Sequence, residues 1–169
     1  NAAGVAISTG IRRGELLGLK WPDIDLVKGT LTVARARIKP GTETKSPKTR
    51  TSGRTISLGP EAVRFLAGLR DGQDADRALW GAAWTDTGFV VVLSDGTPPR
   101  PDSVTGRFKR DCEKFGIRYV TWHGLRHTHA TLSLMAQVPL HVVSLNLGHA
   151  NPGVTLDFYA QVLLRSTAE

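Results

Sequence analysis

The chain has 169 residues, 40% of them hydrophobic and 22% charged, which is long and apolar enough to fold around its own core. The single Cys112 excludes an internal disulfide and a zinc site built from several cysteines, and it favours a reducing, cytoplasmic environment. No apolar run approaches the roughly 20 residues that span a bilayer, and we see no export signal. The net charge of +7 at pH 7 favours a polyanionic partner.

The first half of the chain predicts short helices around a small sheet. No start signal precedes the first segment, so we expect the chain to begin inside a domain. Apolar spacing and turn residues predict, in chain order, a helix end at 1–8, a helix at 12–20, a half-buried strand at 30–38, a strand that pairs with it at 54–58 and a helix at 61–69. The fifteen residues between the two strands are rich in Thr, Ser, Gly, Pro and Lys, and we expect them to form a long basic hairpin tip.

The second half predicts mainly helices. Residues 71–88 show no strong period and are assigned to a loop, whereas residues 89–93 look like a short buried strand before a turn at 95–99. Further helices are expected at 102–115, 123–136, 138–147 and 152–164. Asp102 is the expected cap of the first of them. The predicted fold class is α+β, mainly α-helical, with a small antiparallel β-sheet on one side.

Positive charge is concentrated in and between the two predicted strands. Seven basic residues and one acidic residue, Glu43, lie from position 35 to position 54, which accounts for +6 of the net +7. A lone basic run is usually a solvated loop, but such a run also attracts the phosphates of DNA. The residues that we expect to contact DNA are Arg35, Arg37, Lys39, Lys45, Arg50 and Arg54.

The last quarter of the chain gathers side chains that suit chemistry at a phosphodiester. His123 and Arg126 are three residues apart, so on a helix they point to one side and can reach one phosphate, whereas His127 and His129 are expected to face elsewhere. His149 falls in a turn between two predicted helices, where a side chain can project into a cleft. Taken singly, each of these residues is more easily explained as a helix cap or as a partner in an ion pair.

Tyr159 supplies the remaining requirement of such a site. A phosphodiester under attack needs cationic donors around its oxygens, a proton donor for the leaving group and a nucleophile able to form a covalent ester. Tyr159 lies among apolar residues at helical spacing, so composition alone favours a core aromatic. What favours a nucleophile instead is a resemblance to a known family.

Four segments closely resemble the tyrosine recombinases, also called phage integrases. They are TGIRRGELLGLKWPDID at 9–25, PKTRTSGRTISL at 47–58, HGLRHTHATL at 123–132 and LGHANPGVTLDFYA at 147–160, in the order of that family. The resemblance covers essentially the whole chain, so it implies one catalytic domain over residues 1–169 with the DNA breaking-rejoining fold. The family's N-terminal DNA-clamping domain is expected to be absent from this chain, and Gln137 stands where the family commonly has glycine.

The resemblance implies a set of catalytic residues. Some of them would bind the negatively charged phosphate, and one would protonate the leaving group. Arg12, followed by Glu15 at the expected position, and Arg126 would bind the non-bridging phosphate oxygens, a task that suits the planar guanidinium. Lys48 would protonate the leaving 5′ oxygen, with Lys45 as the alternative lysine. His149 and the proton-handling His123, together with the nucleophile Tyr159, complete the set.

The chemistry implied is attack of the Tyr159 phenol on the scissile phosphorus, which gives a 3′-phosphotyrosyl bond and a free 5′ hydroxyl. One phosphoester replaces another, so we expect no cofactor, neither a metal nor ATP. The resemblance also implies double-stranded DNA as the partner and a homo-tetramer on two duplexes for the full-length protein. Excisionase or host DNA-bending proteins would assist it in a bacterial cytoplasm.

These features favour a site-specific recombinase that integrates or excises a phage or another mobile element. Two alternatives stay open, namely Xer-like resolution of DNA dimers by the same chemistry and a DNA-binding remnant that no longer cleaves. A metallohydrolase is a third, because five histidines lie within 27 residues. The sequence argues against it, since Gly124 stands where a zincin motif needs Glu and carboxylates are absent nearby.

Overall fold

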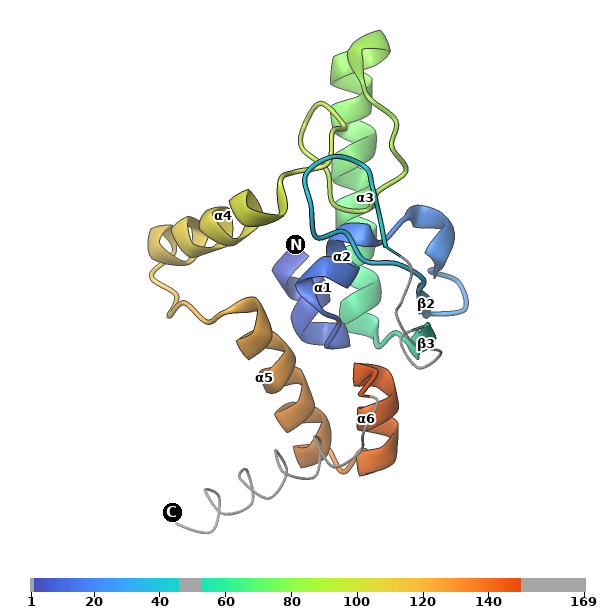
Figure 1. Cartoon of the computed structure of the whole chain (residues 1–169), viewed down its shortest axis with the longest axis vertical. Coiled ribbons are helices and arrows are strands. Elements are labelled where there is room, and N and C mark those ends of the chain that lie inside the picture. Colours follow the sequence, from blue (N-terminus) through green and yellow to red (C-terminus); the bar gives the residue numbers. More distant parts are fainter. Residues whose placement is uncertain (1, 46–52, 150–169) are drawn as a thin grey trace.

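The computed structural model describes residues 2–45 and 53–149 of the chain. Helices surround one short central helix, and a small sheet lies at one side (Figure 1). In chain order the elements are α1 (Ala2–Thr9), α2 (Arg13–Gly18), the 3-10 helix η1 (Trp21–Asp23), β1 (Ile24–Asp25), β2 (Thr30–Val33), β3 (Arg54–Ser57), α3 (Pro60–Trp80), the 3-10 helix η3 (Gly81–Ala83), α4 (Pro101–Lys114), α5 (Trp122–Met135) and α6 (Leu140–Leu147). The predicted fold class, mainly helical with a small antiparallel sheet, is confirmed.

Small residues allow α1 to lie at the centre of the domain, where it packs against α3 and α5. Val5 and Thr9 are buried, and the Thr9 hydroxyl donates to the Val5 carbonyl at 2.6 Å. A side chain at Gly4 would meet the ring of Phe65 on α3 at 2.7 Å, so glycine permits the close approach of these two helices. The helix stops where Gly10 adopts a φ of +66°.

The antiparallel sheet has the strand order β1, β2, β3. Buried Leu31 of β2 faces buried Ile56 of β3, so the predicted pairing of these two strands is confirmed. The strand β2 is shorter than predicted, because the Arg37 N–H donates to the Gly14 carbonyl at 2.8 Å and holds the chain against α2 instead of β3. The two-residue strand β1 was not predicted.

The helix α3 is longer than predicted, so the expected loop at 71–88 is wrong for its first part. The end of α3 projects from the domain and is largely exposed, so it lacks the apolar stripe that reveals a helix in sequence (Figure 1). Gln73 ties it to the core by donating to the carbonyls of Phe89 and Val90 at 3.2 and 2.7 Å and by accepting from Trp21 Nε1 at 2.9 Å. Phe89 and Val90 are buried as predicted, but their segment does not form the expected strand.

The helices α4, α5 and α6 confirm three predicted helices, with shifts of one or two residues at their ends. Because α4 begins at Pro101, Asp102 lies in its first turn and is not the cap that we expected. Thr121 caps α5, where its hydroxyl accepts from the Gly124 N–H at 2.9 Å. Between α5 and α6, Gln137 adopts a φ of +61°, the left-handed conformation that favours glycine.

The core is built in two parts. The larger cluster joins α1, α2, α3, the sheet and the start of α5, and a smaller one joins α5 to α6 through Ala130, Leu134, Val143 and Leu147. The helix predicted at 152–164 lies outside the described residues. Among the helices of residues 2–45 and 53–149, none is both long enough and apolar enough to cross a membrane.

Candidate active site

The start of α2 brings Arg12 and Glu15 together. Glu15 accepts from the Arg12 N–H at 2.8 Å and from Arg12 Nη1 at 2.9 Å, as the spacing of three residues predicts. Arg12 Nη2 donates to the Gly148 carbonyl at 3.2 Å, although 136 positions separate the two residues. The Arg12 side chain is 45% exposed, so it is held in place and still open to a ligand.

Arg54, the first residue of β3, holds the same Glu15 carboxylate. Its Nη1 and Nη2 donate to Glu15 at 3.1 and 2.9 Å, and its Nε donates to the Asn146 carbonyl of α6 at 2.6 Å. Burial would raise the pKa of Glu15, but hydrogen bonding and the charge of Arg54, with a further contribution from Arg12, outweigh burial and lower it. Glu15 is therefore a buried anion that ties α2 to β3 and, through Arg54, to α6.

Arg126 extends from α5 to the junction of two turns. Its Nη1 donates to the Gly10 carbonyl at 2.8 Å and its Nη2 to the Leu147 carbonyl at 2.6 Å. Burial, followed by the nearby charge of Arg12, lowers the pKa of Arg126 to about 10, so it stays charged at neutral pH. The two bonds engage one N–H on each terminal nitrogen, so further donors of the planar group remain for a ligand.

His149 follows Gly148, whose φ of +66° ends α6 in a left-handed turn. A side chain at Gly148 would lie 2.8 Å from the Arg54 guanidinium, so this turn needs glycine for space as well as for conformation. Partial burial, and then the charges of Arg126, Arg12 and Arg54, lower the pKa of His149 to about 4. His149 is therefore neutral at neutral pH in the free protein.

His123 is exposed at the start of α5, and its ring packs edge-on against that of His127 with the centroids 4.4 Å apart. The expectation that His127 faces elsewhere is therefore wrong, and its spacing of four residues from His123 was the signal. His129 does face elsewhere, with Nδ1 3.0 Å from the Ile7 carbonyl. Burial and the charges of His123 and Arg126 lower the pKa of His127.

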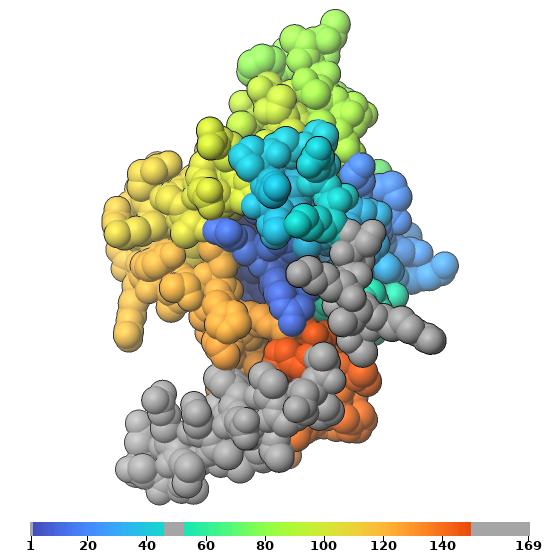
Figure 2. Space-filling model, viewed as in Figure 1, coloured from blue at the N-terminus to red at the C-terminus, as the bar shows by residue number. Residues whose placement is uncertain are grey.

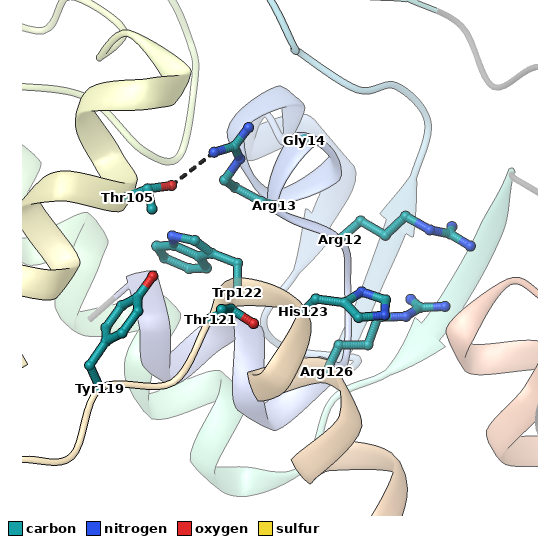
Figure 3. A pocket seen from close by; sticks show the side chains of 9 residues that line it. All are labelled: Arg12, Arg13, Gly14, Thr105, Tyr119, Thr121, Trp122, His123 and Arg126. Atoms are coloured by element: carbon teal, nitrogen blue, oxygen red, sulfur yellow. Dashed lines mark hydrogen bonds between the residues drawn. The ribbon is translucent and has the colours of Figure 1, made fainter. Parts of the chain in front are cut away.

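A pocket of about 420 Å³ opens beside these residues and includes Arg12, His123 and Arg126 in its lining. Their side chains extend in the same direction at one end of the pocket (Figure 3). In the space-filling view the blue N-terminal residues lie recessed between the orange surface of α5 and a cyan surface from the chain after β2 (Figure 2). Two guanidinium groups and an imidazole therefore meet at one pocket, although they come from two separate helices.

The described part of this site suits stabilisation of negative charge on a phosphate. Arg12 and Arg126 are fixed by backbone carbonyls before any ligand arrives, and such preorganised donors are an effective means of stabilising a developing anion. His123 is exposed and positioned to exchange a proton with a group in the pocket. Among residues 2–45 and 53–149, no group of three or more His, Cys, Asp or Glu is arranged to hold a metal ion.

Several predicted site residues in the described part of the chain are not in the lining of this pocket, and they are His149, Arg35, Arg37, Lys39, Lys45 and Arg54. Lys48, Arg50 and Tyr159 lie outside the described residues. Lys39 and Lys45 are exposed, and Arg35 is partly exposed and forms an ion pair with Asp23. Contact of these residues with DNA stays a prediction.

Two of the residues predicted to contact DNA have guanidinium groups that bond inside the protein, so their contact with DNA stays a prediction that this structure does not support. Arg37 is fully buried and donates to the carbonyls of Leu17, Gly41 and Pro99 at 3.1, 3.2 and 2.9 Å. Arg54 is held by its bonds to the Glu15 carboxylate and has a side chain only 8% exposed. A count of charges along the sequence does not distinguish such buried arginines from exposed ones.

Comparison with known proteins identifies the class to which this fold and site belong. The model of the Phage integrase family matches residues 1–165, so the chain belongs to the phage integrase family. The resemblance seen in four sequence segments is thereby confirmed. The family comprises the tyrosine recombinases.

Relatives in sequence include recombinases of bacteria and of a phage. A protein named tyrosine recombinase XerC-like, from Caldanaerobacter subterraneus subsp. tengcongensis, is 32% identical over 94% of this chain and 44% of its own length. The integrase of Staphylococcus phage L54a is 29% identical over 95% of this chain and 47% of its own length. The chain therefore spans less than half the length of these relatives.

Solved structures share the fold. The Tn1549 transposon integrase, in complex with a circular intermediate DNA, superposes with a TM-score of 0.77 at 21% identity, over 93% of this chain and 52% of that one. The XerA recombinase superposes with a TM-score of 0.70 at 26% identity, over 92% of this chain and 50% of that one. The chain thus has the tyrosine recombinase catalytic-domain fold.

Proposed function

We propose that this chain is the catalytic domain of a site-specific recombinase, which cuts and rejoins DNA strands through a covalent bond to Tyr159. The observation that carries the proposal is the convergence of Arg12, Arg126 and His149. These residues belong to three distant segments that arginine-to-carbonyl hydrogen bonds join at one place. Packing alone does not require two partly unsatisfied guanidinium groups at such a junction.

The charge balance of the cluster supports a phosphate as its ligand. Within residues 2–45 and 53–149, Arg12 and Arg54 form ion pairs with one carboxylate, Glu15, and Arg126 donates to backbone carbonyls. The charges of all three arginines lower the pKa of His149, so the described part of the cluster has more positive than negative groups. A scissile phosphate would compensate this excess, with Arg12 and Arg126 donating to the non-bridging oxygens.

The proposed reaction balances without a further reactant. The Tyr159 oxygen bonds to phosphorus as the bond to the 5′ oxygen breaks, so the number of phosphoester bonds is unchanged and no ATP is needed. About a thousandth of a free phenol is ionised at neutral pH, so the proton of Tyr159 must be taken up, and we assign this to His123. Lys48 gives a proton to the leaving oxygen, and the arginines supply the positive charge that a metal would otherwise provide.

We further propose that the full-length enzyme integrates or excises a mobile element and acts as a tetramer on two DNA duplexes, assisted by excisionase or DNA-bending proteins. The relatives that support this include the phage L54a integrase and the ICEBs1 integrase of Bacillus subtilis. Resolution of DNA dimers by the same chemistry is the second candidate, and the XerC-like relative at 32% identity favours it.

The proposal is tested by trapping the covalent intermediate. The chain is incubated with a labelled recombination-site duplex that is nicked close to the cleavage position, so that the short 5′-hydroxyl fragment diffuses away after attack. We expect an adduct that resists denaturation, forms in the presence of chelator and is lost in Tyr159→Phe. Tyr119→Phe is the matched control, because the chain has two tyrosines, and this variant should still form the adduct.

The alternatives give different results in the same assay. An adduct that persists in Tyr159→Phe would show that another residue is the nucleophile, and an adduct that requires a divalent metal would contradict the proposed absence of a cofactor. Saturating, sequence-selective binding without any adduct would indicate a DNA-binding remnant. A plasmid assay that scores integration against dimer resolution distinguishes the two enzymatic candidates.

A further inference from the structure

The pocket beside the catalytic arginines extends to a second group of side chains that the proposed chemistry does not use. At the end away from Arg12, its walls are formed by Arg13, Thr105 of α4, Tyr119 and Trp122 (Figure 3). The side chains of the neighbours Arg12 and Arg13 diverge, one toward the catalytic cluster and the other toward α4 (Figure 3). The two guanidinium groups therefore serve opposite ends of one pocket.

Arg13 is held by a neutral group and not by an acid. Its Nη1 donates to the Thr105 hydroxyl at 2.8 Å, which links the start of α2 to α4. Among the described residues, Arg13 forms no ion pair with a carboxylate, whereas Arg12 and Arg54 both bond to Glu15. A hydroxyl fixes the orientation of the guanidinium without cancelling its charge, so the pocket end at Arg13 remains attractive to an anion.

The wall beside Arg13 is aromatic. Phe108 of α4 packs against both Trp122 and Tyr119, with ring centroids 5.1 and 5.8 Å apart. These contacts join α4 to Tyr119 and to Trp122, the first residue of α5, so the Thr105 hydroxyl is carried on a helix that contacts the start of α5. A cation fixed above an apolar wall suits a nucleotide, which presents an anionic phosphate next to the apolar face of its sugar.

We propose that Arg13, positioned by Thr105, binds the DNA phosphate next to the scissile one. The inference rests on the proposed function in that the ligand of the pocket is taken to be DNA. Neighbouring residues have Cα atoms about 3.8 Å apart, and with diverging side chains they are suited to adjacent phosphates of one strand and not to the same phosphate. Such a contact sets the register in which the scissile phosphate meets Arg12 and Arg126.

The test maps phosphate contacts by ethylation interference, which needs binding but no cleavage. A duplex selected by the chain from a random pool is ethylated sparsely on its phosphates, and the positions at which ethylation blocks binding are compared between variants. We expect Arg12→Gln to lose interference at one phosphate and Arg13→Gln to lose it at the adjacent phosphate of the same strand. Loss of a charge-assisted contact should weaken binding by about tenfold or more.

Three further variants separate a contact from a general effect on folding or charge. Arg13→Lys keeps the charge and should restore part of the interference at that phosphate, and Thr105→Val should weaken interference there alone. Arg64→Gln makes the same charge change at an exposed position of α3 and should leave the pattern unchanged. Circular dichroism confirms that each variant is folded.

The inference is overturned if Arg13→Gln loses interference at the same phosphate as Arg12→Gln, at a distant phosphate or at none. Failure of the proposed function is a separate result, because it appears as absence of the covalent adduct with the unaltered chain. If Arg13→Gln loses interference at the adjacent phosphate but the unaltered chain forms no adduct, the Arg13 contact is supported and cleavage is refuted. If the unaltered chain forms the adduct but Arg13→Gln has an unchanged interference pattern, cleavage is supported and the Arg13 contact is refuted.

Discussion

Glu15 of α2 accepts two hydrogen bonds, of 2.9 and 3.1 Å, from Arg54, the first residue of β3. The pair forms the base on which Arg12 rests, because Arg12 bonds to the same carboxylate. Arg12, which we propose binds the scissile phosphate, is thus positioned by an ion pair whose basic member was predicted from the sequence to contact DNA.

Replacing Glu15 with Gln should destabilise the domain and make its stability less dependent on pH. The change removes the carboxylate charge that Arg54 and Arg12 both contact, and loss of one member of an ion pair with little exposure costs about 3 kcal/mol. Because folding lowers the pKa of Glu15 from its ordinary value of 4.5, its contribution is present above that value and is lost as the pH falls through the lower folded pKa. Urea unfolding at several pH values in this range measures the free energy of unfolding of both proteins. The same dependence of that free energy on pH in both proteins would contradict the role of Glu15.

Replacing Arg126 with Lys should slow formation of the covalent adduct by about a hundredfold to a thousandfold. An ammonium group keeps the charge but has no planar fork with which to bond the Gly10 and Leu147 carbonyls while donating to a phosphate. Single-turnover rates on the nicked duplex measure the effect. Arg64→Lys, the same change at an exposed site, should react like the unaltered chain, and an equally mild effect at Arg126 would refute its role.

His149 should titrate far below an ordinary histidine in the free protein. Burial and the surrounding arginines favour the neutral ring, so NMR should give a pKa of about 4. Because folding lowers the pKa of His149 from its ordinary value of 6.5, its contribution to stability is fully present above pH 6.5. That contribution is lost as the pH falls toward the folded pKa of about 4, since only the unfolded chain takes up the proton there. Bound DNA should raise this pKa, because phosphates offset the arginines; a pKa that is ordinary in the free protein and unmoved by DNA would contradict the cluster.

The choice between Lys48 and Lys45 as the general acid can be made with a sulfur leaving group. A thiolate leaves without protonation, so a duplex with sulfur in place of the bridging 5′ oxygen should rescue the variant that lacks the acid. We expect Lys48→Ala to lose about a hundredfold to ten-thousandfold on ordinary DNA and to recover on the sulfur-containing duplex. Recovery of Lys45→Ala, with no recovery of Lys48→Ala, would reverse the assignment.

How far the sequence predicted the fold depended on which residues were buried. The helix α5 was located to within a residue, because its apolar face leaves a pattern in the sequence. The end of α3 was missed, because it is exposed and is held by Gln73, whose bonds to distant carbonyls leave no periodic signal. Gln137, noted where the family commonly has glycine, does adopt the left-handed conformation that would explain that preference.

For the site, the residue types were predictable and their environments were not. The resemblance assigned Arg12 and Arg126 to the site, but not the carbonyls of Gly148, Gly10 and Leu147 that fix them, since those contacts join segments far apart in the chain. Charge counting placed Arg37 and Arg54 at a DNA surface, whereas the structure buries Arg37 and pairs the Arg54 side chain with Glu15. Hydrogen bonds and ion pairs between distant segments depend on the tertiary structure and leave no local pattern in the sequence.

The identity of the residue that carries the DNA tests the account most directly. The chain has two tyrosines, and trypsin separates them, because Tyr119 falls in residues 119–126 and Tyr159 in residues 127–165. Tyr119 lines the pocket, so geometry alone offers it as a rival nucleophile. After nuclease trimming of the trapped adduct, mass spectrometry should find the nucleotide on Tyr159 in the longer peptide. A nucleotide on Tyr119, or on any residue other than Tyr159, would contradict the account.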